Sequence, residues 1–171
     1  TNTSQSENPT QAPDVIVTNS PQSTTDTTQT QSPPQNQTVI RTPTLGIGDE
    51  ENRIVSSLGT PTSERQSVIG KDRVLSYKNF DSDRVDVSYT SDNKTGKIKQ
   101  TEVAFNQSVG IDSIEQTLAN MLGGNVPEAL QAGVRQVYEG QTDMRSLDLG
   151  QYKAIVRNQK DKIYVGIWAR N

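Results

Sequence analysis

The side chains of this chain that could do chemistry are carboxylates, lysines and hydroxyls, because its 171 residues include no cysteine and no histidine. The lack of cysteine excludes disulfides, thiolate metal ligands and cysteine nucleophiles. The lack of histidine excludes imidazole ligands and a Ser-His-Asp triad. A catalytic site would therefore need paired acids or a serine activated by a lysine.

Acidic residues form one cluster and one pair. Four acids near a predicted turn would offer oxygen ligands to Ca²⁺: Asp81, Asp83, Asp86 and Asp92. They lack the alternate ligand spacing, the central glycine and the terminal glutamate of an EF-hand loop, so we interpret them as turn residues and predict no metal site. Asp86 and Glu102 would suit a glycosidase pair, but both fall at outward-facing positions of predicted strands.

The lysines are equally weak candidates. Ser63, Ser67 and Lys71 have the residue types of a Ser-Lys nucleophile, yet they fall in a predicted loop with nothing to desolvate the lysine. A basic strip follows at Lys94, Lys97 and Lys99. It has no interleaved aromatic residue for base stacking, and the net charge is -3, so we predict no nucleic-acid partner. The sequence thus predicts no catalytic residue, no enzyme and no cofactor.

Binding candidates gather in the closing segment, residues 151–169, which holds the only tryptophan. An aromatic side chain beside an arginine is the usual make-up of an interface anchor. The predicted binding residues are Tyr152, Arg157, Lys162, Tyr164 and Trp168. The competing interpretation, which we favour for Trp168, is burial against helices. In that interpretation Gly166 admits a helix packed closely above it.

These residues lie on a predicted β-hairpin with a polar turn at 158–161. Alternation along its second strand, 162–169, places three aliphatic residues on one side, Ile163, Val165 and Ile167. Tyr164 and Trp168 fall on the other side. A strand that is apolar on both sides needs cover from both sides or a neighbour at each edge. We therefore expect it at the centre of a sheet packed by helices.

The residues before this hairpin predict a helix and three strands. The helix lies within 45–63, with Asp49 as N-cap and Gly59 at its C-terminal end. An antiparallel meander follows, with turns at 81–83 and 91–96 and with strands at 73–80, 84–90 and 97–105.

Two more helices are predicted between the meander and the hairpin. A capping box at Asp112–Glu115 begins the first, and Gly123 ends it. The second begins near Pro127 and ends at Gly140. The stretch 141–150 is ambiguous between a helical turn and a loop. The fold class is therefore α+β, an antiparallel sheet with about three short helices packed on it.

Residues 1–44 differ in composition from the rest. Thr, Ser, Gln, Asn and Pro make up 34 of these 44 residues, and none is aromatic. Such a segment cannot bury enough apolar surface to offset the entropy lost on ordering, so we predict a disordered tether. Residues 45–171 then form a single domain, whose halves 45–105 and 106–171 share a helix-then-strands rhythm. Because no initiating Met or signal peptide is present, we expect Thr1 to mark a cut inside a longer chain.

The first half carries one resemblance. Its helix ending in LG-x-P, its strand of the RVDVSY kind and its Gly-Lys turn resemble the SmpA/BamE-type module of bacterial envelope lipoproteins. This chain departs from that pattern because it has no cysteine to be lipidated. The resemblance implies an envelope assembly or structural interaction factor.

The closing segment carries a second resemblance. The matching residues are Arg157, Asn158, Asp161, Lys162, Ile163, Tyr164, Val165, Gly166, Ile167 and Trp168. Together with the tether, they resemble the extracytoplasmic C-terminal region of cyanobacterial transmembrane serine/threonine kinases. The Gly-rich phosphate loop, H-R-D and D-F-G motifs of the kinase itself are missing.

The second resemblance implies a non-catalytic sensory module on the periplasmic side of the plasma membrane. It would be held to the membrane only through a segment before Thr1, and it would be a monomer in isolation. Its ligand would be a peptide, a cell-wall fragment or a protein partner.

Overall fold

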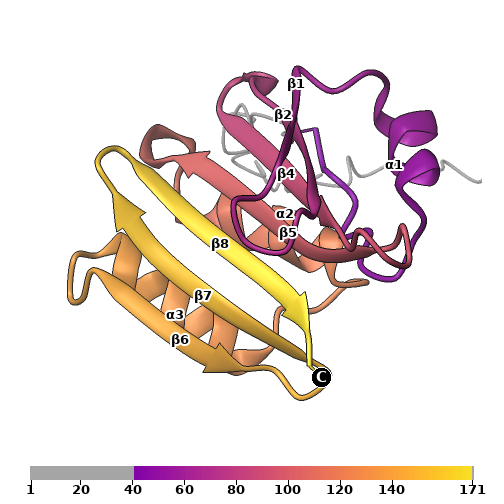
Figure 1. Ribbon diagram of the computed structural model, residues 1–171. Helices are drawn as coiled ribbons and strands as arrows, with labels where there is room; N and C mark the ends of the chain where they lie inside the picture. The colour runs from indigo at the N-terminus through magenta and orange to yellow at the C-terminus, as the bar shows by residue number, and fades with distance from the viewer. Residues whose placement is uncertain (1–40, 171) are drawn as a thin grey trace, which may run out of the picture. The chain divides into compact units, whose positions relative to one another are not determined.

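The structure, a computed structural model, describes residues 41–170, so residues 1–40 of the predicted tether lie outside the described part. The described chain has the α+β fold expected from the sequence, a seven-stranded antiparallel sheet with three helices (Figure 1). In spatial order the strands are β1 (Ser63–Gln66), β2 (Arg73–Tyr77), β4 (Val85–Ser91), β5 (Ile98–Asn106), β8 (Lys162–Ala169), β7 (Tyr152–Gln159) and β6 (Met144–Asp148). A further short strand, β3 (Phe80–Asp83), lies against β4.

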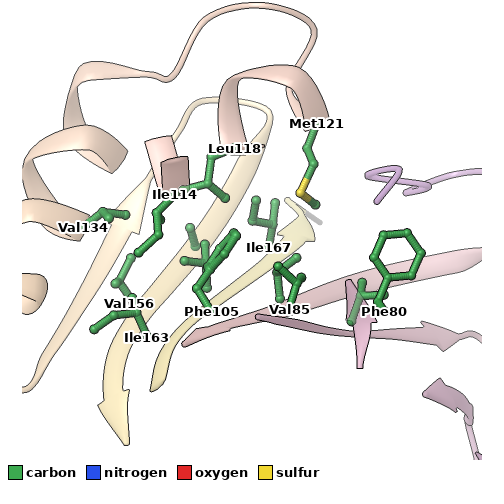
Figure 2. Packing of buried hydrophobic residues seen from close by; sticks show 14 of the residues in the cluster. Phe80, Val85, Phe105, Ile114, Leu118, Met121, Val134, Val156, Ile163 and Ile167 are labelled. Carbon is green, nitrogen blue, oxygen red and sulfur yellow. The ribbon is translucent and has the colours of Figure 1, made fainter. Parts of the chain in front are cut away.

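Helices α2 (Ile111–Met121) and α3 (Glu128–Tyr138) cover the same face of the sheet, behind the strands in Figure 1. Each helix buries one apolar stripe, as expected of a surface helix. The stripes consist of Ile114, Leu118 and Met121 on α2, and of Leu130, Val134 and Val137 on α3. Figure 2 shows the α2 side chains pointing toward the sheet, where Phe105 and Ile167 are buried. This single core contains residues of both predicted halves.

All three predicted helices are present, but two predicted caps are wrong. Helix α1 (Glu51–Leu58) has Glu50, not Asp49, at its N-cap. The backbone around Asp49 pairs instead with β5, where the Ile98 N–H donates a hydrogen bond to Asp49 O at 2.8 Å. The N-cap of α2 is Gly110, and no side chain caps its first turn, so the predicted capping box does not form.

Three strand assignments also differ from the prediction. The predicted turn at 81–83 belongs to β3, and β2 ends at Tyr77 because the chain reverses through Asn79, whose φ is 52°. The ambiguous stretch 141–150 contains β6. Part of the loop that was predicted around Ser63, Ser67 and Lys71 forms β1. Both are edge strands that are almost wholly exposed, so neither shows the alternation that marks a half-buried strand. Of the helices in residues 41–170, none is long and apolar enough to cross a membrane.

Candidate functional site

Strand β8 lies at the centre of the candidate site, between β5 and β7. The predicted alternation is confirmed, because Ile163, Val165 and Ile167 are at most 1% exposed and belong to the core under the helices. The intervening residues point to the opposite face of the sheet, which we call the outer face. It consists, around β8, of Gln100, Glu102, Ala104, Asn106, Lys153, Ile155, Arg157, Gln159, Lys162, Tyr164, Gly166 and Trp168. Every one of these residues except Ala104 and Gly166 is partly or fully exposed.

Strand pairing arranges the outer face in rows across the sheet. In one row Trp168 stands between Gln100 and Lys153. In the next row Gly166 lies between Glu102 and Ile155, and in the third Tyr164 is opposite Arg157. Side chains directly opposite one another are close enough to interact, so the rows bring aromatic, charged and aliphatic groups into contact range.

Arg157 joins two of these rows. Its guanidinium carbon lies 5.1 Å from the centre of the Tyr164 ring, within the range of a cation–π interaction. One of its nitrogens, Nη2, lies 3.3 Å from Glu102 Oε1. The side chain of Arg157 remains 46% exposed in this position. It therefore presents a planar cation with free donors, which suits a carboxylate, a carbonyl or a further aromatic ring.

Lys162 forms the second ion pair of the outer face. Its Nζ lies 2.5 Å from Asp86 Oδ2, and the hydrogen bond from this ammonium to Asp86 raises the pKa of Lys162. The other oxygen of Asp86 accepts a hydrogen bond from the Asn79 N–H at 2.7 Å. Asp86 and Glu102 thus face outward as predicted, and each forms an ion pair, Asp86 with Lys162 and Glu102 with Arg157.

Gly166 lies between the two aromatic residues of β8. The expectation that a helix packs above it is wrong, because Gly166 is on the face turned away from α2 and α3. A Cβ at this position would meet only the Ile155 side chain, at 3.2 Å. The Ile155 side chain thus lies over Gly166, which is itself buried.

The favoured burial of Trp168 against the helices is also wrong. Trp168 shares the outer face with Tyr164 and is partly exposed there, because the helices that would have covered it lie on the other face. Tyr152, by contrast, is on the helix-covered side with Ala154 and packs against the core. The structure therefore brings together four of the five predicted binding residues and separates Tyr152 from them.

Sequence reasoning missed Gln100, Glu102 and Ile155 as neighbours of Trp168 and Tyr164. Alternation along strand 97–105 was enough to orient Glu102 outward. It could not show that β5 pairs with β8, because the two strands are far apart in the chain.

Two of the remaining acidic candidates, Asp81 and Asp92, have local partners. Within residues 41–170, no group of three or more acids is arranged to hold a metal ion. Asp81 pairs with Arg84 at 2.7 Å. Asp92 accepts hydrogen bonds from the backbone N–H groups of Lys94 and Thr95, which lower the pKa of Asp92. Ser63 lies in β1, and the Ser67 hydroxyl accepts a hydrogen bond from the Ile69 N–H at 3.3 Å.

Comparison of the chain with protein-family models, with curated proteins and with solved structures found no match. A proposal for its function therefore rests on the outer face and on the residue patterns of the sequence.

Proposed function

We propose that this domain is a non-catalytic binding module that recognises a peptide, a cell-wall fragment or a protein partner on its outer face. The observation that carries the proposal is the partly exposed pair Tyr164 and Trp168 on β8, beside the exposed cation of Arg157. Aromatic residues and arginine dominate the binding energy of protein interfaces. A ligand that covers one of these rings would gain roughly 1–3 kcal/mol from apolar burial.

The composition of the face supports an extended or planar ligand. Gln100 and Lys153 flank the Trp168 ring with hydrogen-bonding groups. This combination of flat apolar rings and adjacent polar groups suits a peptide segment or a sugar ring.

We place the module outside the cytoplasm, in a membrane-anchored protein of the cyanobacterial serine/threonine kinase type. The pattern of residues 157–168 and the composition of residues 1–44 support this setting. A tether of this composition would raise the local concentration of bound copies rather than transmit a rigid displacement. Ligand capture would then signal by bringing copies together.

The test uses Trp168 as an internal reporter, since it is the only tryptophan in the chain. Peptides selected from a phage-displayed random library, and soluble fragments of peptidoglycan, are titrated against the whole chain while tryptophan emission is followed. We expect a saturable change in emission with at least one probe, and a loss of affinity of about tenfold in Arg157→Gln.

The matched control is Arg145→Gln, because Arg145 is an exposed arginine of β6 on the other face of the sheet. It should bind like the unaltered chain. Binders that retain full affinity for a Tyr164→Ser/Trp168→Ser double variant, measured by pull-down, would show that the ligand site lies elsewhere.

A further inference from the structure

The tip of the β1–β2 hairpin carries two aliphatic side chains in open solvent. Val68 is 99% exposed and Ile69 is 85% exposed. Among the described residues only one other large hydrophobic residue is exposed, Met144 at 53%. Neighbouring β-branched residues at such exposure are unusual on a soluble surface, and they indicate a contact with an apolar partner.

Polar contacts hold the backbone of this tip in place. Ser67 N–H donates to Asp72 O at 2.7 Å and closes the hairpin. Asn93, in the turn between β4 and β5, donates from its side chain to Gly70 O at 2.8 Å. The Asn93 N–H also donates to the Asp72 carboxylate at 3.1 Å. The two turns are therefore tied together, and the tie involves neither aliphatic side chain.

Positive charge flanks the aliphatic pair on both turns. Lys71 follows the tip directly, and Lys94 follows Asn93; neither forms an ion pair with an acid in residues 41–170. The charge of Asp72 is offset by Lys99, whose Nζ lies 2.5 Å from it. Asp92, the other nearby acid, is engaged by backbone N–H groups of its own turn.

We propose that this tip is a lipid-contact site, which inserts Val68 and Ile69 into the interfacial layer of an anionic membrane while Lys71 and Lys94 meet the headgroups. The flanking lysines favour a lipid surface over a pocket in a protein, because the diffuse negative charge of a headgroup layer complements cations on both sides of a protruding apolar tip. Two aliphatic residues and two lysines give weak, reversible binding. The contact therefore suits a domain that is already kept near a membrane, and it is independent of the outer face.

The test is co-sedimentation of the whole chain with vesicles over a range of lipid concentrations. One set contains phosphatidylcholine with about 40 mol% phosphatidylglycerol, an anionic lipid whose charge attracts basic segments. The other set contains phosphatidylcholine alone. We expect partitioning onto the anionic vesicles only. Val68→Ser/Ile69→Ser should reduce it by about tenfold or more, and Lys71→Gln/Lys94→Gln by about 25-fold, at about fivefold for each lysine.

Met144→Ser is the matched control, since it also removes an exposed apolar side chain and should leave partitioning unchanged. A second readout uses the absence of cysteine: a bimane fluorophore on Ile69→Cys should shift its emission to the blue with anionic vesicles, and one on Met144→Cys should not. No partitioning onto either vesicle, equal partitioning onto both, or retention by the Val68→Ser/Ile69→Ser variant would each overturn the proposal. The first of these results would leave a protein pocket as the partner of the tip.

Discussion

At the scale of single residues, Asp72 shows how one carboxylate can join separate parts of the chain. It is 7% exposed, accepts a hydrogen bond from the Asn93 N–H and pairs with Lys99. The hydrogen bond from Lys99 is the main cause that lowers the pKa of Asp72 below its usual value of 3.8. The same residue therefore connects the β1–β2 hairpin, the β4–β5 turn and β5.

This pKa shift predicts how an Asp72→Asn variant depends on pH. Because the carboxylate has a lower pKa in the folded chain than in the unfolded chain, it stabilises the fold above pH 3.8, and this contribution is lost as pH falls through the folded value. Asp72→Asn should therefore be less stable than the unaltered chain at pH 7, and the difference should shrink below pH 3.8. Urea unfolding at both pH values measures it.

The control for this prediction is Asp148→Asn. Asp148 pairs with Arg170 at 3.0 Å, but both side chains are about half exposed, and such surface pairs contribute little. A difference for Asp72→Asn that stays constant from pH 7 to pH 3 would mean that the substitution acts through packing and not through charge.

At the scale of elements, the turn that leads into α1 offers two glycines with similar backbone angles and different surroundings. Gly46 has φ of 67° and Gly48 has φ of 88°, in the left-handed region that other residues rarely adopt. A Cβ at Gly46 would lie 2.6 Å from Ile54 Cδ1 and 3.3 Å from the Tyr89 ring, whereas a Cβ at Gly48 would meet nothing within 4 Å.

Gly48→Ala should consequently lose about 1–2 kcal/mol of unfolding free energy, from backbone strain alone. Gly46→Ala should lose that amount and roughly 1–3 kcal/mol more, because Ile54 and Tyr89 are buried and cannot move aside freely. Denaturant unfolding of the two variants side by side measures the excess. Equal losses would show that the core around α1 yields to an extra methyl group.

For the individual elements, the sequence predicted correctly those features that depend on a local pattern of apolar residues. Apolar stripes located the three helices, and alternation in 162–169 separated Ile163 from Tyr164 correctly. The edge strands β1 and β6 were missed because they form by pairing with β2 and β7 and bury almost nothing themselves. The caps of α1 and α2 were misplaced because tertiary pairing near Asp49, and a glycine at 110, decide where those helices begin.

At the scale of the whole molecule, the geometry of the outer face depends on the order of the strands and on which face the helices cover. No local residue pattern encodes either of these. Trp168 is accessible because α2 and α3, consecutive between β5 and β6, both cover one face of the sheet. Glu102 reaches Arg157 because the last strand of the first half pairs with the last strand of the second. Both facts are properties of sheet order, which pairs strands about 60 residues apart.

The same sheet order predicts that the two halves of the domain do not fold separately. Strand β5 pairs with β4 on one side and with β8 on the other, and the core under α2 contains Val85, Val103 and Phe105 from the first half. A fragment of residues 41–106 would keep those side chains without the helices that cover them. We therefore expect it to show no cooperative thermal transition by circular dichroism.

Mixing that fragment with residues 107–171 should restore the transition, because the second fragment supplies β8 to the free edge of β5 and the two helices to the exposed core. The second fragment with Val165→Asp should not restore the thermal transition, because Val165 is fully buried opposite Val103. Lys153→Asp, a change to an exposed residue of β7, should still restore it. A cooperative transition in residues 41–106 alone would instead establish the first half as an independent folding unit and support an origin of the domain by joining two such units.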